Sequence, residues 1–337
     1  HFHTLLQAPA GIAMDTLCCA TFLCTFPLNS IAACVSATAA MFVYGGSTLR
    51  TVLLAYFCWM LVDPCPEKGG YSFLWKLGIT DFLRRGFFWR WASRYFPVTM
   101  RVTSPLPAEK GPYIFVCHPH GIIGVSPMTS FGTDACGFSE AFPGLSVHLL
   151  GHNAIFRIPF FREWCLMHGH GSVSKKTCLH LLRHGRCIGL APGGAKESLE
   201  SVPGTMRLVL RSRKGFAKLA LSTGAALVPV IGFGENDLYA TVQFEKGSIR
   251  RKIQEQLQNC LGFALPVFCG RTWLPLVPLR RHVTTLVGAP LYPPKNIAEP
   301  SEEQVDLFHR QYCEALEQLF EQHKAEYGMA ETKLVLV

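Results

Sequence analysis

The feature that most constrains this chain is a long uncharged run near its N-terminus. Residues 16–49 contain no charged side chain, and after Arg50 the apolar character continues over residues 51–62. Pro27 and the pair Gly45-Gly46 divide the run into pieces, whereas a helix that crosses a bilayer needs about 20 apolar residues. We therefore predict two tight transmembrane helices or a re-entrant hairpin. The alternative is a buried core hairpin of a soluble protein, which we disfavour because so much uncharged surface is costly in water.

The composition favours a membrane surface as the partner of this chain. The sequence is 49% hydrophobic and only 16% charged, with a formal net charge of +9. A basic excess favours anionic partners, and no zinc-finger spacing or RNA-recognition signature is present, so nucleic acid is not expected. The fourteen cysteines cluster in apolar segments, which predicts free thiols in a reducing, cytosol-facing environment.

Residues 71–97, "YSFLWKLGITDFLRRGFFWRWASRYFP", interleave aromatic rings with arginines and a lysine. Such mixtures suit the lipid headgroup layer, where rings rest and basic side chains extend to phosphates. We predict an interfacial aromatic-basic helix here, with the following chain on the cytosolic side. The alternative is an ordinary amphipathic helix packed on the core.

The remainder of the chain alternates strand-like and helical patterns. A helix is predicted over 206–224, with Gly224 as its stop, and a last amphipathic helix over 301–327, opening at Ser301. This alternation predicts an α/β fold with a mixed or mostly parallel sheet flanked by helices. The strand-like runs are 113–117, 187–191, 226–232 and 283–287.

The sequence His118-Pro119-His120-Gly121 follows the first of these strands. Parallel sheets place ligand-handling residues at such strand ends, and Pro119 restricts both itself and His118. Gly121 allows close approach of a substrate to the backbone. Because imidazole titrates near neutrality, either histidine could take a proton from an alcohol that attacks an acyl carbon. The alternative is a structural turn whose ring nitrogens bond to carbonyls.

Two other chemistries receive less support. His148, His152, His168 and His170 would suit a metal, but nearby acidic partners are absent, so we predict no metal site. Cys117 ends a buried strand, which is a poor setting for a nucleophilic thiolate. No G-x-S-x-G sequence is present, which argues against a serine lipase.

A glycine-rich turn, "GLAPGGAKESLESVPG" at 189–204, follows the second strand. Backbone N–H groups near Gly193 and Gly194 could hold a phosphate or an oxyanion, although the order of residues is not that of a P-loop. Glu197 is a candidate second acid or an orienting partner for a histidine; the alternative is a surface glutamate in a tight turn.

A cluster of cations lies shortly after the glycine turn. Arg211, Arg213 and Lys214 would suit an anionic ligand with several phosphates. A solvated basic face explains the same cluster equally well.

Together these segments resemble the type-2 diacylglycerol acyltransferase family, with its monoacylglycerol acyltransferase and wax synthase relatives. The matching segments occur in order: "YFCWMLVD" at 56–63, "RYFP" at 94–97, "HPHG" at 118–121, "FPGL" at 142–145, "IPFFRE" at 158–163, "GGAKESL" at 193–199, "RKGFAKLAL" at 213–221 and "FGEND" at 233–237.

The resemblance implies an enzyme of the endoplasmic reticulum membrane or lipid droplet that moves a fatty acyl group from acyl-CoA to a hydroxyl. Diacylglycerol is the first expected acceptor, with monoacylglycerol and a fatty alcohol as alternatives. Acyl-CoA is a co-substrate and no cofactor is expected; membrane lipid is a further partner, and a homo-oligomer is left open. A non-catalytic lipid-droplet scaffold and a metal-dependent membrane hydrolase are the rival interpretations.

The residue patterns and the resemblance together predict three parts: a hydrophobic membrane hairpin (1–63) with one or two transmembrane segments, an interfacial aromatic-basic helix and linker (64–110), and a cytosol-facing acyltransferase domain (111–337). Related acyltransferases pair a histidine with an aspartate five residues on, but here Ile123 follows His118 and Val125 follows His120. Glu197 or a backbone carbonyl is expected to replace that aspartate. The catalytic candidates are His118, His120 and Glu197; the substrate-binding candidates are Pro119, Gly121, Gly193, Gly194, Arg162, Arg211, Arg213, Lys214 and Asn236.

Overall fold

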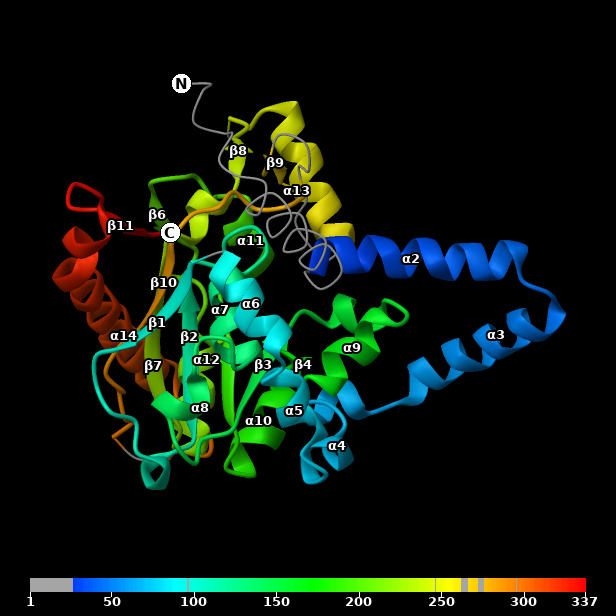
Figure 1. Ribbon diagram of the computed structural model, residues 1–337. Helices are drawn as coiled ribbons and strands as arrows, with labels where there is room; N and C mark the ends of the chain where they lie inside the picture. The colour runs from blue at the N-terminus through cyan, green and yellow to red at the C-terminus, as the bar shows by residue number, and fades with distance from the viewer. Residues whose placement is uncertain (1–26, 96, 246, 262–265, 272–275, 295) are drawn as a thin grey trace.

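The computed structural model describes residues 27–337 except 96, 246, 262–265, 272–275 and 295. The first part of the uncharged run, residues 16–26, and position 96 of the "RYFP" segment lie outside the described residues. A seven-stranded sheet with the order β1-β10-β7-β2-β5-β3-β4 forms the centre of the molecule (Figure 1). Its strands are β1 (Val98–Val102), β2 (Tyr113–His118), β3 (Val147–Gly151), β4 (Gly171–Ser172), β5 (Cys187–Leu190), β7 (Ala226–Phe233) and β10 (Val283–Val287).

Neighbouring strands of this sheet are parallel except for the antiparallel pair β7 and β10. The predicted mostly parallel α/β sheet is therefore confirmed. The smaller pairs are β6 (Met206–Leu208) with β11 (Leu334–Leu336), and β8 (Ala240–Val242) with β9 (Val267–Cys269). The division into 1–63, 64–110 and 111–337 stays a prediction; β1, from the second of these segments, forms an edge of the main sheet.

Helices cover both faces of the sheet and extend beyond one side of it (Figure 1). The α-helices are α2 (Pro27–Tyr44), α3 (Ser47–Val62), α4 (Ser72–Lys76), α5 (Ile79–Arg84), α6 (Phe87–Tyr95), α7 (Val125–Pro127), α8 (Phe138–Ala141), α9 (Phe161–Met167), α10 (Lys175–Arg183), α11 (Gly194–Ser198), α12 (Gly215–Thr223), α13 (Ile249–Leu261) and α14 (Glu302–His323). Shorter helical turns are η1 (Cys65–Lys68), η2 (Ala108–Lys110), η3 (Met128–Gly132), η4 (Asn153–Arg157), η5 (Glu235–Leu238) and η6 (Lys324–Tyr327).

Strand β2 lies in the interior and is buried on both of its faces. Ile114 and Val116 belong to the hydrophobic cluster that includes residues of α10, α12 and α14. Phe115 and Cys117 belong to the opposite cluster, with Phe131 and Phe138. Because side chains alternate along a strand, this register places the last residue of β2, His118, on the side of α14.

All four predicted strands are present, within one residue at each end. The last helix is confirmed as well: Ser301 caps α14, and Gln304 completes a capping box. The helix predicted over 206–224 is wrong in its first part. There Met206–Leu208 form β6, since pairing with β11 outweighs the local helical pattern; only α12 is helical, and it ends at Gly224 in the left-handed conformation (φ 76°).

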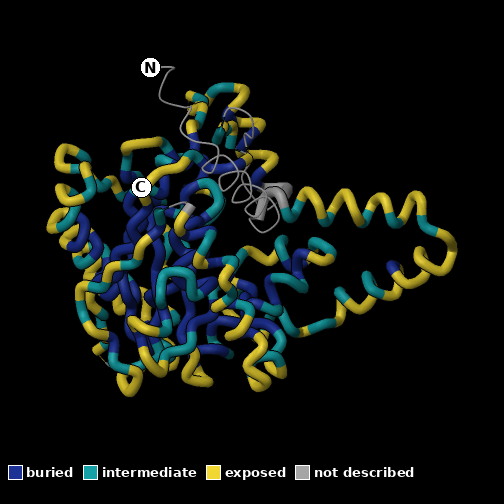
Figure 2. The backbone as a smooth tube through the Cα atoms, viewed as in Figure 1, coloured by how far each residue is buried: buried dark blue, intermediate teal, exposed yellow. Residues whose placement is uncertain are grey.

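The two helices α2 and α3 form a hairpin that extends away from the sheet (Figure 1) and is largely exposed (Figure 2). By length and composition alone, the Ser47–Lys68 stretch is the one helix in the described residues long and apolar enough to cross a membrane. The described part of α2 is apolar but shorter. The predicted hairpin is thus present as a structural element, and its insertion into a membrane stays a prediction.

The prediction of a single aromatic-basic helix over 71–97 is wrong. The segment forms three short helices, α4, α5 and α6, separated at Gly78 and Gly86. Gly78 has φ 71°, a conformation that favours glycine and ends a regular helix. Phe82 is 76% exposed, whereas Trp89 is 3% exposed, so the aromatic rings divide between the surface and the core.

A buried ion pair fastens the helical hairpin to the domain. Arg162, at the start of α9, is 0% exposed and its guanidinium pairs with Asp63, just beyond the end of α3, and with Glu163 (2.9 Å). The ring of Trp59 lies 4.7 Å from the Arg162 guanidinium carbon. The positive charge predicted to contact substrate is therefore already paired within the protein.

We expect the substitution Arg162→Ala to lower the thermal unfolding midpoint, because it removes the ion-pair partner of the buried Asp63 carboxylate, which keeps a hydrogen bond from the backbone N–H of Cys65. Breaking a buried pair in this way costs about 3–5 kcal/mol. Arg157→Ala, an exposed arginine of η4, is the matched control and should leave the midpoint near that of the parent. Equal midpoints for the two variants, with only KM changed in Arg162→Ala, would contradict the fastening role.

Candidate active site

His118 is the more deeply buried of the two histidines. Its side chain is 1% exposed, and Nε2 lies 3.0 Å from the Tyr312 hydroxyl on α14. Its Nδ1 has no hydrogen-bond partner in the part of the chain that the structure describes. Burial lowers the pKa of His118 to about 3, so the ring is neutral. A ring so enclosed is poorly placed to contact a substrate.

His120 lies two residues beyond the end of β2 and is half-buried. Its Nδ1 is 3.1 Å from the Gly121 carbonyl oxygen and 3.0 Å from the Ser198 hydroxyl. A carbonyl oxygen only accepts, so this contact assigns the proton to Nδ1 and leaves the lone pair on Nε2. Burial also lowers the pKa of His120. This is the arrangement of a general base: one nitrogen fixed, the other able to take a proton.

Glu197 connects the histidine turn to two other segments of the chain. Its side chain is 1% exposed; Oε1 accepts the His120 backbone N–H (2.5 Å) and Oε2 accepts that of Val209 (2.9 Å). Burial raises the pKa of Glu197 to about 7, while the two N–H groups and the charge of Arg213 act in the opposite direction. The carboxylate thus orients the His120 backbone, and the ring itself is oriented by Gly121 and Ser198.

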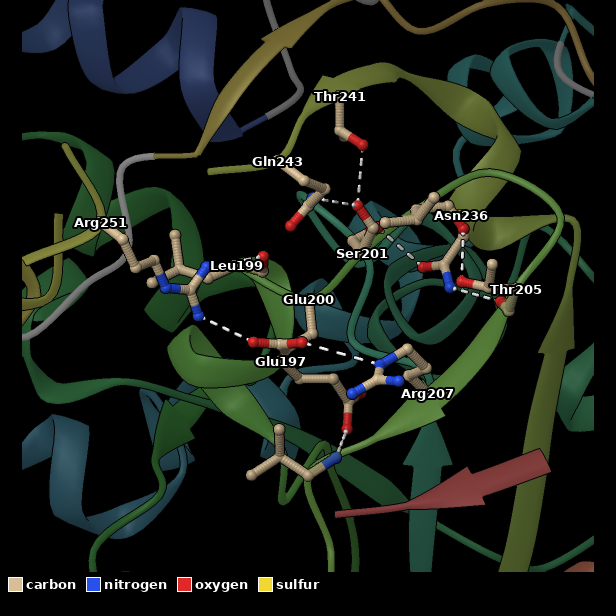
Figure 3. A network of polar contacts seen from close by, with 12 residues as sticks. Glu197, Leu199, Glu200, Ser201, Thr205, Arg207, Asn236, Thr241, Gln243 and Arg251 are labelled. Atoms are coloured by element: carbon tan, nitrogen blue, oxygen red, sulfur yellow. Dashed lines mark hydrogen bonds and ion pairs between the residues drawn. The ribbon is translucent and has the colours of Figure 1, made fainter. Parts of the chain in front are cut away.

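The loop after Glu197 is held by a network of polar contacts (Figure 3). Arg251 donates to the Leu199 carbonyl and pairs with Glu200 (2.7 Å). The Ser201 hydroxyl donates to Oδ1 of Asn236 (2.9 Å). This loop lies directly C-terminal to α11, so the network fixes the helix that carries Glu197.

Asn236, a predicted substrate contact, uses both ends of its amide inside the protein. Oδ1 accepts from Ser201, and Nδ2 donates to the Thr205 carbonyl (3.0 Å). Asn236 and Pro119 line a cleft of about 10 Å³, which is room for about one water molecule. The peptide bond that precedes Pro119 is cis.

The two adjacent glycines of the turn differ in their surroundings. A Cβ on Gly193 would lie 2.1 Å from Oε2 of Glu197, so the glutamate side chain occupies the space that the missing Cβ leaves. Gly194 has φ 53° and no heavy atom within 4 Å of the position of a Cβ. Its backbone is therefore the accessible part of the predicted phosphate or oxyanion cradle.

The sequence reasoning missed a second buried glutamate. Glu235, just after β7, is 2% exposed, and its carboxylate accepts the backbone N–H groups of Val125 (2.9 Å) and Ser126 (2.7 Å). Burial raises its pKa to about 7. A Cβ on Gly121 would lie 2.6 Å from Oε1 of Glu235, so this carboxylate packs against the histidine turn. An acidic residue after a buried strand was its one sequence signal.

The three predicted phosphate-binding cations are not equivalent. Lys214 pairs with Asp306 (2.6 Å), and Arg211 is exposed. Arg213 is half-buried, and its charge acts on the pKa of Glu197. Arg213 is the member of this group that the structure brings to the Glu197 region.

The remaining histidines and Cys117 lie in settings that differ from that of His120. The rings of His148, His168 and His170 bond to backbone carbonyls. In the described residues no group of three or more metal-ligating side chains occurs. Burial raises the pKa of the Cys117 thiol, which leaves it protonated and unreactive.

These features place a histidine with one fixed ring nitrogen just after the carboxyl end of a parallel strand, with its backbone N–H bonded to a buried carboxylate. This turn is therefore the candidate active site of an enzyme. Residues 41–337 match the family described as diacylglycerol acyltransferase, and the chain belongs to this family. The chain is 40% identical to diacylglycerol O-acyltransferase 2 of Dictyostelium discoideum over 288 residues, 83% of this chain and 84% of the relative.

Two further relatives carry other acceptor names. Acyl-CoA wax alcohol acyltransferase 1 of Homo sapiens is 40% identical over 294 residues, 85% of this chain and 87% of that protein. 2-acylglycerol O-acyltransferase 1 of Bos taurus is 39% identical over 291 residues, 84% of each chain. The resemblance predicted from the motifs is confirmed.

We expect Gly193→Ala to lower activity by at least about 100-fold, because the new methyl group displaces Glu197 and releases the His120 backbone. The measurement is kcat/KM for acyl transfer. Gly215→Ala is the matched control, since no atom lies within 4 Å of the position of its Cβ. Activity of Gly193→Ala close to that of Gly215→Ala would show that the contact between Glu197 and His120 is dispensable.

Proposed function

We propose that this chain is an acyl-CoA:diacylglycerol O-acyltransferase that forms triacylglycerol. The observation that carries this proposal is the His120 ring, whose Nδ1 is held by Gly121 and Ser198 and whose Nε2 can accept a proton. Family membership supplies the reaction class, since the relatives named above are all O-acyltransferases or alcohol acyltransferases.

The proposed reaction is a direct transfer without an acyl-enzyme intermediate. Nε2 of His120 takes the proton of the acceptor hydroxyl as its oxygen attacks the thioester carbonyl. The tetrahedral intermediate then collapses, the C–S bond breaks, and the CoA sulfur leaves with the proton returned by His120. Backbone N–H groups at Gly121 or Gly194 would hold the oxyanion, and His118 acts as a positioning residue that packs the turn against α14.

The membrane attachment is part of the same proposal. The α2–α3 hairpin would insert into the endoplasmic reticulum or lipid-droplet membrane, with the acyltransferase domain on the cytosolic side. Exposed apolar side chains on the hairpin, among them Leu61 (87% exposed) and Val62 (77%), support this. The ion pairs of Arg162 would then hold the histidine turn at a fixed height above the bilayer. The acyl chain and the acceptor would enter the site from the bilayer.

The CoA phosphates are proposed to lie near Arg211 and Arg213, beside the Glu197 segment. Lys214 contributes less, because its charge is partly neutralised by Asp306. The alternative acceptors are 2-acylglycerol and a long-chain alcohol, and the relatives with those names at 39–40% identity favour keeping both in the test.

The test is acyl transfer from labelled oleoyl-CoA to diacylglycerol, 2-acylglycerol or a fatty alcohol in membranes that contain the chain. We expect triacylglycerol from the parent and a loss of about 100- to 10,000-fold in kcat for His120→Ala, the range general-base help supplies. His152→Ala, an exposed histidine, is the matched control and should retain full activity.

His118→Ala separates the two histidines. We expect it to lower the unfolding midpoint, because it removes a buried ring that bonds to Tyr312, and to lower activity only in proportion to the folded fraction. His120→Ala should leave the midpoint unchanged. Normal turnover in His120→Ala, with kcat lost in a stably folded His118→Ala, would reverse the assignment; product from another acceptor alone would change the substrate and keep the mechanism.

A further inference from the structure

A second cavity, of about 550 Å³, lies away from the histidine turn. Val147 and Arg186 line it, and these residues stand at the beginning of β3 and just before β5. Both strands run parallel in one sheet with β2, whose far end carries His118. The cavity therefore opens at the amino-terminal edge of the sheet, opposite the proposed active site.

Positive side chains dominate the walls of this cavity. Five cations face two carboxylates, Asp81 and Asp134. Of the carboxylates, Asp134 already pairs with Arg85 (3.4 Å) and accepts from the Ser139 hydroxyl (2.6 Å). The cations are Lys68, Lys76, Arg84, Arg85 and Arg186.

Arg84 brings a buried and incompletely neutralised charge to this wall. It is 5% exposed, and its terminal nitrogens donate to the carbonyls of Val147 (2.7 Å) and Phe131 (2.8 Å). In the described residues it makes no ion pair with a carboxylate. Burial lowers its pKa to about 10, while the charges of Asp81 and Asp134 act in the opposite direction. The guanidinium therefore remains charged at neutral pH and favours a further anion nearby.

Arg186 and Trp75 add to the same wall. The guanidinium carbons of Arg84 and Arg186 lie 5.5 Å and 6.0 Å from the Trp75 ring centroid. The hydroxyl of Ser146, another lining residue, is buried and has no partner in the described part of the chain. The guanidiniums of Arg84 and Arg186 and the unpaired hydroxyl of Ser146 thus belong to residues that line one cavity. This set of donors is suited to binding an oxyanion.

The mouth of the cavity lies beside apolar surface. Lys68, one of its lining residues, ends the apolar Ser47–Lys68 stretch. Helices α4 and α5, at the base of the hairpin (Figure 1), expose Phe73 (57%), Leu77 (68%) and Phe82 (76%). Cations bordered by exposed apolar side chains at the end of an apolar helix suit the headgroup layer of a bilayer.

We propose that this cavity is a binding site for the headgroup of an anionic phospholipid with a terminal phosphate. Arg186 and Lys76 contact the phosphate at the mouth, the Ser146 hydroxyl donates to it, and the exposed rings of α4 and α5 rest among the acyl chains. The site rests on the proposed membrane attachment and is separate from the transfer reaction, so it ties the domain to anionic membrane regions.

The test uses the full chain purified in a neutral detergent and titrated with dioctanoyl phosphatidic acid, with affinity measured from intrinsic fluorescence or thermophoresis. Dioctanoyl phosphatidylcholine, inorganic phosphate and CoA are the comparison ligands. We expect phosphatidic acid to bind more tightly than all three. Lys76→Ala and Arg186→Ala should each weaken it about fivefold, the contribution of one basic side chain at an anionic lipid surface.

Arg183→Ala is the control and should bind like the parent, because Arg183 is an exposed arginine at the end of α10, three residues before Arg186, and does not line the cavity. All three variants should keep parental acyl transfer in phosphatidylcholine membranes, which makes a failure here distinguishable from a failure of the proposed activity. Equal binding of inorganic phosphate or CoA, no binding of phosphatidic acid, or equal loss in Arg183→Ala would each overturn the proposal.

Discussion

The buried carboxylate of Glu197 is the interaction on which the rest of this site depends. An isolated carboxylate is costly to remove from water, and here two backbone N–H groups and the nearby charge of Arg213 offset part of that cost. Those N–H groups belong to His120, after β2, and to Val209, after β6. Because β6 pairs with β11 at the end of the chain, one carboxylate links the histidine turn, the glycine turn and the C-terminal segment.

The geometry of a β-strand separates the roles of the two histidines. His118 continues the alternation of side chains along β2, so its ring lies in the core beside α14 and forms a hydrogen bond with the Tyr312 hydroxyl. His120 comes after the strand has ended, so its ring is not committed to either face and bonds locally to Gly121 and Ser198. A pair that looks symmetrical in the sequence therefore consists of one ring packed in the core and one ring, that of His120, which we propose as the base. The hairpin, held by the buried Arg162, and the basic cavity at the amino-terminal edge of the sheet are built from other residues than the histidine turn.

Local patterns in the sequence predicted the buried strands, the capped C-terminal helix and the position of His118-Pro119-His120-Gly121, because each depends on near neighbours. Contacts between residues far apart in the sequence were not predictable. The hydrogen bond between Tyr312 and His118 joins residues 194 positions apart, and the one between Glu235 and the Val125 backbone joins residues 110 positions apart. The sequence alone predicts Arg162 as a substrate contact, because a single sequence does not show that Asp63, 99 positions away, is its ion-pair partner. Gly78 and Gly86, by contrast, are visible in the sequence as breaks in the aromatic-basic segment. They divide this segment into three short helices in spite of its amphipathic pattern.

The most direct test of the central claim is a structure of the chain with diacylglycerol and an unreactive acyl-CoA analogue. The account predicts the acceptor hydroxyl oxygen within about 2.6–3.2 Å of Nε2 of His120, with Nδ1 still bonded to Gly121 and Ser198. A hydroxyl bound elsewhere, with the His120 ring turned away from it or His118 exposed to take its place, would contradict the assignment of the base.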